Sequence, residues 1–186
     1  MKISTRRVAA LFSGAALVLA GSVLVAPTAQ AATSCVTTAN TSNYRTVACS
    51  TITSKSSTFV VADSDGVINS TGQTATLECS ITKSATVSMS VSTTLEASVK
   101  AGILADFKAS VGVSMSASVT TESSIKTSVS VPAHKTILCE RGIVKYTLKG
   151  QTVYTTTNMA TGSTSKSTKT WTIAGPTSKT WKLVQQ

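Results

Sequence analysis

The chain has 186 residues, with 17 lysines and arginines against 7 aspartates and glutamates and a formal net charge of +10. This length suits one domain with its own hydrophobic core and excludes an array of domains. Because only 4% of the residues are aromatic, the core must consist mainly of Val, Ile, Leu and Ala, which bury less area per residue.

Residues 1–31 are typical of a secretory signal peptide. A basic start that includes Arg6-Arg7 precedes an apolar run over residues 8–26, and Ala29-Gln30-Ala31 matches an A-x-A cleavage site. The apolar run is also long enough for an uncleaved membrane anchor, and the two arginines leave twin-arginine export open. We expect cleavage, a secreted extracellular protein, and a single all-β domain over residues 32–186.

The four cysteines all lie in the predicted mature chain. An even number in an exported protein indicates disulfides, and four cysteines allow three pairings. Of these we favour Cys35 with Cys49, a local loop, and Cys79 with Cys139. Neither a CxxC motif nor histidine at zinc-ligand spacing accompanies them, so we expect no metal and no cofactor.

Positive charge is concentrated at the C-terminus. Residues 141–186 contain seven lysines and arginines and no acidic residue, whereas residues 32–140 contain seven of each sign. The basic segment predicts a partner such as anionic lipid, a cell-wall polymer or nucleic acid. Lysines that keep strand edges soluble explain it equally well.

The same segment contains a short repeat, in which Lys169-Thr170-Trp171 resembles Lys179-Thr180-Trp181. Gly175-Pro176 lies between the copies, which predicts a hairpin of two Trp-bearing strands. Exposed tryptophan beside lysine suits a membrane interface or a sugar ring, and tryptophan packed on a core is the alternative. The predicted surface-docking residues are Lys169, Trp171, Lys179, Trp181 and Lys182.

Ser, Thr and Val dominate the chain after residue 31, which favours strands and gives no helical period. Asp63-Ser64-Asp65-Gly66 is typical of a hairpin turn. From residue 87 to residue 131, all odd positions are apolar except Thr93, Thr121, Ser123 and Thr127, whereas Leu104 is the only apolar even position between 88 and 130. We therefore expect an elongated antiparallel sheet with long twisted strands and a long amphipathic β-hairpin.

The alternating run must fold back on itself, because 45 residues of one strand would extend about 150 Å. If the odd residues keep one face through the turn, opposed residues have matching parity and the loop has an odd length. A loop over 101–105 places Lys100 opposite Asp106, a favourable charge pair. The arms, about 86–100 and 106–120, exceed the 9–11 residues that a tilted strand needs to cross a bilayer.

In a membrane barrel the apolar face of such a hairpin contacts lipid and the polar face lines the lumen. One hairpin cannot close a barrel, so several copies would each donate one. The predicted membrane-inserting residues are Val87, Met89, Val91, Leu95, Val99, Ile103, Leu104, Phe107, Val111, Val113, Met115 and Val119. The predicted lumen-facing residues are Glu96, Lys100, Asp106 and Lys108.

An amphipathic Ser/Thr-rich hairpin with an apolar tip, followed by Val131-Pro132-Ala133-His134-Lys135 and a Val/Tyr strand, resembles the pore-forming module of aerolysin-type β-pore-forming toxins. The resemblance covers about residues 74–157. It implies long twisted strands and a hairpin that lies against the sheet in the soluble monomer and forms a membrane β-barrel after oligomerisation. The arms lack the aromatic girdle of typical membrane barrels, and no recognisable lectin or receptor-binding sequence precedes the hairpin.

No catalytic motif accompanies this pattern. His134 is the only histidine, the seven carboxylates are scattered, and neither a nucleophile elbow nor a phosphate loop is present. We expect a protein that is not an enzyme and has no small-molecule substrate, with a membrane or anionic cell surface and its own copies as partners rather than nucleic acid. The alternative is a non-lytic secreted structural or cell-wall-binding β protein, because a soluble sheet with one wet face also alternates.

Overall fold

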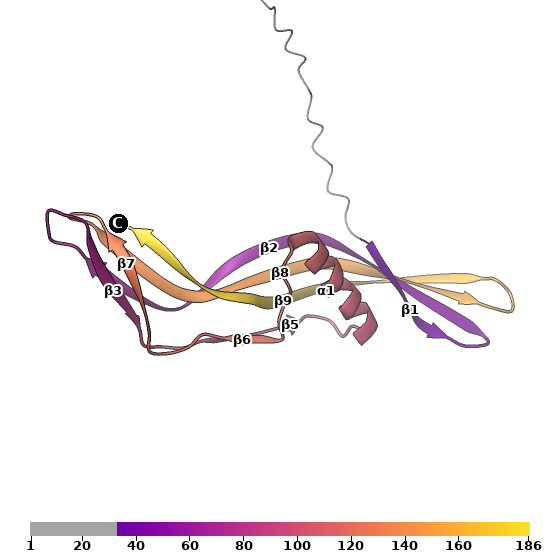
Figure 1. Cartoon of the computed structure of the whole chain (residues 1–186). Coiled ribbons are helices and arrows are strands. Elements are labelled where there is room, and N and C mark those ends of the chain that lie inside the picture. The colour runs from indigo at the N-terminus through magenta and orange to yellow at the C-terminus, as the bar shows by residue number, and fades with distance from the viewer. Residues whose placement is uncertain (1–32) are drawn as a thin grey trace, which may run out of the picture. The chain divides into compact units, whose positions relative to one another are not determined.

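Three long antiparallel strands form the body of the molecule in a computed structural model that describes residues 33–186 (Figure 1). They are β2 (Tyr44–Ile68), β8 (Thr136–Asn158) and β9 (Thr164–Gln185), and β8 pairs with the other two along almost its whole length. Thr, Val and Ser populate these strands, as side chains suited to a pleated surface do. The predicted all-β class with long strands is confirmed. The predicted signal peptide, residues 1–31, lies outside the described residues.

Short strands complete the sheet and form two small ladders beside it. β1 (Thr33–Asn40) covers the first part of β2, and β5 (Ser90–Val91) pairs with β9, which gives the order β1-β2-β8-β9-β5. One small ladder joins β3 (Ala75–Ile81) to β7 (Ile125–Val131), and the other joins β4 (Thr86–Ser88) to β6 (Ser118–Thr120).

Two glycines of β8 allow aromatic rings to lie against the backbone of the sheet. β2 has bulges opposite Gly150 and Gly142. A Cβ atom at Gly150 would lie 2.5 Å from the Trp171 ring, and one at Gly142 would lie 2.6 Å from the Phe59 ring. Because a bulge increases local twist, these pairs place an aromatic ring beside each of the two twisted positions.

The two predicted disulfides are confirmed. Cys35 and Cys49 are directly opposed on β1 and β2, and Cys79 of β3 is bonded to Cys139 of β8. The second bond lies in a small core that ties the β3–β7 ladder to the long sheet. Each bond typically contributes about 2–4 kcal/mol by restricting the unfolded chain.

A helix was not expected, yet α1 (Ala97–Val111) occupies the middle of the alternating run. The predicted loop over 101–105, with Lys100 opposite Asp106, is therefore wrong for this structure. The large side chains Val99, Ile103 and Phe107 are four residues apart, a spacing that lies on one face both in a strand and in a helix. Alanines between them favour the helix.

Two predicted turns were also wrong. Asp63-Ser64-Asp65-Gly66 lies inside β2, and Gly175-Pro176 lies inside β9, so the tail is one strand rather than a hairpin. Both segments are themselves paired with β8, and this pairing overrides local turn preference. Pro176 pairs with Lys145 at a register shift of the β8–β9 ladder, and proline is tolerated at such irregularities.

Candidate membrane-inserting segment

The two small ladders share one register. In each β3–β7 pair, from Ala75 with Val131 to Ile81 with Ile125, the two residue numbers add up to 206. The same total holds for every β4–β6 pair, such as Val87 with Val119. It is also the total for Lys100 and Asp106, so the register that parity predicts is confirmed at the base of the hairpin. We call residues 86–120 the insertion segment.

Backbone hydrogen bonds extend this ladder beyond the assigned strands. The Met89 N–H donates to the Ala117 carbonyl at 2.7 Å, and the Thr121 N–H donates to the Ala85 carbonyl at 2.9 Å. Both pairs keep the register. The two arms of the hairpin are thus paired in one register, residues 75–89 with residues 117–131, with one interruption.

The interruption spans residues 82–84 and 122–124 and is held to β2 by a carboxylate. Asp63 accepts bonds from the Thr82 N–H and the Lys83 N–H, both at 2.9 Å, and from the Thr82 hydroxyl at 3.3 Å. The backbone N–H groups of Lys83 and Thr82 hold the pKa of Asp63 below its usual range, because they stabilise the charged carboxylate.

Glu122 holds the other side of the interruption to the long sheet. It forms ion pairs with Arg141 of β8, at 3.4 Å, and with Lys179 of β9. Ser124, two residues on, has a φ of 58°, a left-handed conformation that interrupts an extended strand. We call residues 82–84 and 122–124 the hinge. No motif or spacing in the sequence points to Glu122, and the turn-like composition around Gly66 conceals the role of the two aspartates that precede it.

The first arm leaves the small ladder and follows β9. Ser90 pairs with Ala174, the Ser92 N–H donates to the Thr172 carbonyl at 2.9 Å, and the Ser92 hydroxyl accepts from the Thr172 N–H at 2.8 Å. Open clefts of about 320 and 330 Å³ lie beside Ser92 and Thr93. The arm is therefore hydrogen-bonded to the sheet, but its side chains do not pack closely against the sheet.

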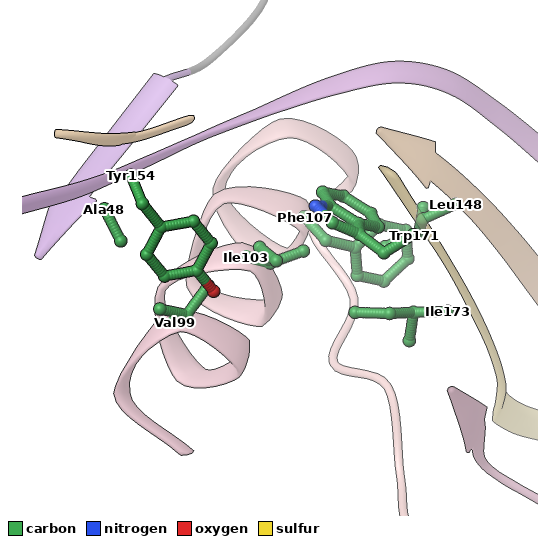
Figure 2. Close-up of a cluster of buried hydrophobic side chains, with 8 residues drawn as sticks. All are labelled: Ala48, Val99, Ile103, Phe107, Leu148, Tyr154, Trp171 and Ile173. Atoms are coloured by element: carbon green, nitrogen blue, oxygen red, sulfur yellow. The ribbon is translucent and has the colours of Figure 1, made fainter. Parts of the chain in front are cut away.

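The helix carries the most buried part of the segment. Val99, Ile103 and Phe107 are each 1% exposed or less. Figure 2 shows them facing side chains of β2, β8 and β9, and these partners are Ala48, Leu148, Tyr154, Trp171 and Ile173. The helix also approaches β1 closely, because a Cβ atom at Gly102 would lie 3.7 Å from the Ser34 Cβ.

The ends of the helix are held differently. Gly112, with a φ of 80°, ends it and donates its N–H to the Lys108 carbonyl at 2.8 Å. At the other end, Glu96 makes no side-chain cap. Burial raises the pKa of Tyr154, and the neighbouring Glu96 carboxylate raises it further.

The predicted membrane-inserting residues are covered to different degrees. Apart from the three buried helix residues, Val113 is exposed, and eight are half-buried: Val87, Met89, Val91, Leu95, Leu104, Val111, Met115 and Val119. Met89 and Met115 lie over Gly175 of β9, where an added Cβ would meet both side chains. Of the predicted lumen-facing residues, Glu96 and Lys108 are exposed and Lys100 and Asp106 are half-buried.

Trp171 is packed on the core, the alternative given above, and is not an exposed surface-docking residue. Trp171 is 3% exposed, and its Nε1 donates to the Thr152 hydroxyl at 3.0 Å. Trp181 is half-buried and stacks under Arg141, whose guanidinium lies 5.4 Å from the ring centroid. Both rings pack on the protein because β9 is one continuous strand. Lys169, Lys179 and Lys182 are exposed, and their docking role stays a prediction.

Residues 33–186 also bear on two other kinds of site. No group of three or more His, Cys, Asp or Glu side chains in this range is placed to hold a metal ion. The one helix described there is too short or too polar to cross a membrane.

Comparison with known proteins does not identify a family for this chain. No family model matches the chain, and no curated protein matches it. Among solved structures, the chain is similar to parasporin-2, a Bacillus thuringiensis toxin that recognises cancer cells. The identity is 14%, the TM-score is 0.23, and the match covers 75% of this chain and 74% of that one. A likeness this weak carries no argument, so the function must be argued from the residues themselves.

Proposed function

We propose that this chain is a secreted pore-forming protein that oligomerises on a target membrane and inserts residues 86–120 as a β-hairpin. The observation that carries the proposal is the register. Pairs on both sides of the hinge already have the alignment that a hairpin with its loop at 101–105 requires. Continuing the ladder needs no slip of one strand past the other. A slip would be costly, because a shift of one residue moves every side chain of the strand to the opposite face.

The helix is compatible with this conversion because its apolar residues serve both structures. Val99, Ile103 and Phe107 contact the core from one face of α1, and as odd residues they would share one face of an extended hairpin. Each contributes about 1.5–3 kcal/mol by leaving water. Lipid would replace the core as their apolar environment, so the conversion exchanges one apolar contact for another.

Oligomerisation follows from the backbone. Within a bilayer every N–H and C=O must be paired, and a lone hairpin has two open edges. Barrels in membranes have about eight strands or more, so about four copies or more would each supply two strands. The polar face, with Glu96, Lys100, Asp106 and Lys108, would line the water-filled interior. Two disulfides support an oxidising, extracellular location, and the proposal assigns no catalytic residue and no cofactor.

A cysteine lock tests whether the segment must leave the sheet. The 3.7 Å separation between Ser34 Cβ and a Cβ at Gly102 suits a disulfide, so Ser34→Cys with Gly102→Cys should fix α1 to β1. We expect the oxidised variant to release almost no dye from vesicles of phosphatidylcholine and phosphatidylglycerol that the unmodified protein permeabilises. Gly102→Cys alone is the control. Because Cys35 is adjacent, peptide mapping must verify the new bond.

A second cysteine pair reports the converted state. Lys100 and Asp106 are six residues apart in α1, about 9 Å along its axis, which is too far for a disulfide. Opposed in the hairpin, their Cα atoms would lie about 4.5–5.5 Å apart. We expect Lys100→Cys with Asp106→Cys to cross-link only on vesicles. Dye release by the oxidised Ser34→Cys/Gly102→Cys protein would contradict the proposal. Cross-linking of Lys100→Cys to Asp106→Cys without lipid would contradict it as well.

The alternative function is that of a non-lytic secreted protein that binds a surface. The buried position of α1 favours it, because three core side chains hold the segment in place. A protein of this kind would stay monomeric on vesicles, release no dye on any lipid composition, and show no Lys100→Cys to Asp106→Cys cross-link.

A further inference from the structure

One end of the long sheet is formed by two hydrogen-bonded turns. The turn between β1 and β2 meets the turn between β8 and β9, where the Met159 N–H donates to the Asn43 carbonyl at 2.8 Å. The Asn158 side chain accepts from the Ala160 N–H at 2.9 Å, and the Thr41 hydroxyl accepts from the Tyr44 N–H at 3.0 Å. We call residues 41–45 and 156–166 the turn end. Its backbone is well supported, so its exposed side chains are presented on a defined surface.

Two large apolar side chains of the turn end face solvent. Tyr44 is 50% exposed and Met159 is 54% exposed. They are neighbours, because Tyr44 pairs with Asn158 across β2 and β8. Beside Tyr44 lies a small pocket of about 150 Å³, lined otherwise by Thr156, Asn158, Ser163, Thr164 and Ser165. An apolar pair next to a pocket of hydroxyl and amide groups suits the boundary between acyl chains and headgroups.

The turn end contains two charged side chains, Arg45 and Lys166, and both are positive. Arg45 and Lys166 are both exposed. Arg45 lies opposite Thr157 of β8, one pair beyond Tyr44 and Asn158. Lys166 lies opposite Thr155, two pairs beyond Thr164 and Thr157. Residues 33–52 and 150–171, the strand segments of this half of the sheet, contain no aspartate or glutamate. The acidic neighbour from another segment is Glu96, which lies beside Tyr154. An anionic surface therefore meets no like charge from these strands.

The opposite end of the sheet also exposes apolar side chains, but its charges are of both signs. Ile68 is 68% exposed and Leu183 is 52% exposed. Asp65 lies three residues before Ile68, and Glu140 pairs with the residue before Leu183. Exposed apolar area alone therefore does not distinguish the ends, whereas the presence of carboxylates at the opposite end does.

The strand direction points the insertion segment toward the turn end. β5 runs antiparallel to β9 with Ser90 opposite Ala174. If this register continued for ten residues, Lys100 would lie level with Thr164, the first residue of β9. The apex residues Ile103 and Leu104 would then reach the turn end.

We propose that the turn end, with Tyr44, Met159, Arg45 and Lys166, is a docking surface for bilayers that contain anionic phospholipid. The tyrosine ring and the thioether enter the interface, the two cations contact headgroups, and the pocket accepts headgroup oxygens through its hydroxyl and amide donors. The inference deepens the proposed function, on which its last step rests, because docking here delivers the apex of the hairpin to the membrane.

Vesicle flotation with the oxidised Ser34→Cys/Gly102→Cys protein separates docking from insertion. We expect this locked protein to bind phosphatidylglycerol-containing vesicles and to bind pure phosphatidylcholine vesicles more weakly. Tyr44→Ala with Met159→Ala should lower the affinity about tenfold or more. Ile68→Ala with Leu183→Ala, equally exposed at the other end, should change it less than twofold.

Charge variants complete the test. Arg45→Gln with Lys166→Gln should weaken binding about fivefold for each charge at low salt, and the difference should vanish at high salt. Lys83→Gln with Lys135→Gln changes the net charge equally and should have a smaller effect. Equal losses in the turn-end and control variants, or binding only to cells through a glycan or protein, would overturn the docking surface. If the locked protein binds as expected but the unlocked protein releases no dye, only the pore-forming proposal fails.

Discussion

The base and the middle of the alternating run have the same parity but different structures. The base, residues 75–88 with 118–131, is paired as strands in one register. The middle, residues 89–117, leaves that ladder after Met89, follows β9 and then forms α1. Alternation therefore predicts which side chains share a face, and it does not by itself decide whether the backbone is a strand.

The difference lies in the size of the odd residues. In the middle, large side chains alternate with alanine, so that the large ones recur every fourth residue: Leu95, Val99, Ile103, Phe107 and Val111. This spacing makes one helical stripe, and the intervening alanines favour a helix. At the base the odd residues are mostly β-branched, as in Val87, Val119, Ile125, Val129 and Val131, which favours strands.

Removal of the largest helix anchor should have the greatest effect. Phe107 is fully buried and its ring contacts Tyr146 at a centroid distance of 5.1 Å. We expect Phe107→Ala to destabilise the docked segment by about 3–5 kcal/mol, because it leaves a cavity in the core. Denaturant unfolding measures the loss, and vesicle leakage should start sooner. Val113→Ala, at an exposed position of the same segment, is the control and should do neither.

A smaller effect should follow from helix propensity alone. Ala101 and Ala105 are exposed on α1 and would lie in the loop of the hairpin, so their replacement affects only the helical state. Ala101→Thr with Ala105→Thr should destabilise the helix by about 1 kcal/mol and speed dye release about fivefold. Ala101→Gln with Ala105→Gln keeps better helix formers at the same exposed sites. If both variants released dye at the unmodified rate, unwinding of α1 would not limit insertion.

Much of the fold could be predicted from the sequence because it rests on local pattern. The register predicted for residues 86–100 against 106–120 holds for residues 86–88 with 118–120, and it continues into residues 75–81 with 125–131. The pairing of Cys79 with Cys139 was predicted because these cysteines flank the alternating run, and the structure confirms it. The helix was missed because parity was counted without regard to side-chain size, although Ala97, Ala101, Ala105 and Ala109 carried the signal.

The remaining errors concern long-range pairing, which short motifs cannot report. Gly175-Pro176 and Asp63-Ser64-Asp65-Gly66 have turn composition, yet each is paired along β8. The hinge carboxylates were missed for a related reason. Asp63 lies 20 residues from Lys83, and Glu122 lies 57 from Lys179, so no spacing in the sequence links the partners.

The smallest predicted effect is a local loosening at low pH of the hinge, which lies inside the base of the alternating run. Because its pKa is lowered in the folded protein, Asp63 stabilises the hinge above its unfolded pKa of about 3.9 and loses this effect as the pH falls further. Amide exchange should show protection of Thr82 and Lys83 declining below about pH 4.

Asp63→Asn should leave these two amides weakly protected at every pH, with little change in global unfolding because the site is exposed. Asp65→Asn is the matched control, since Asp65 accepts only from the Ser80 N–H at 2.7 Å, inside β3, and should affect Ser80 alone. Protection of Thr82 and Lys83 that is the same in Asp63→Asn and the unmodified protein would remove Asp63 from the hinge. If protection falls but dye release at acidic pH does not rise, release of the hinge is not the step that limits insertion.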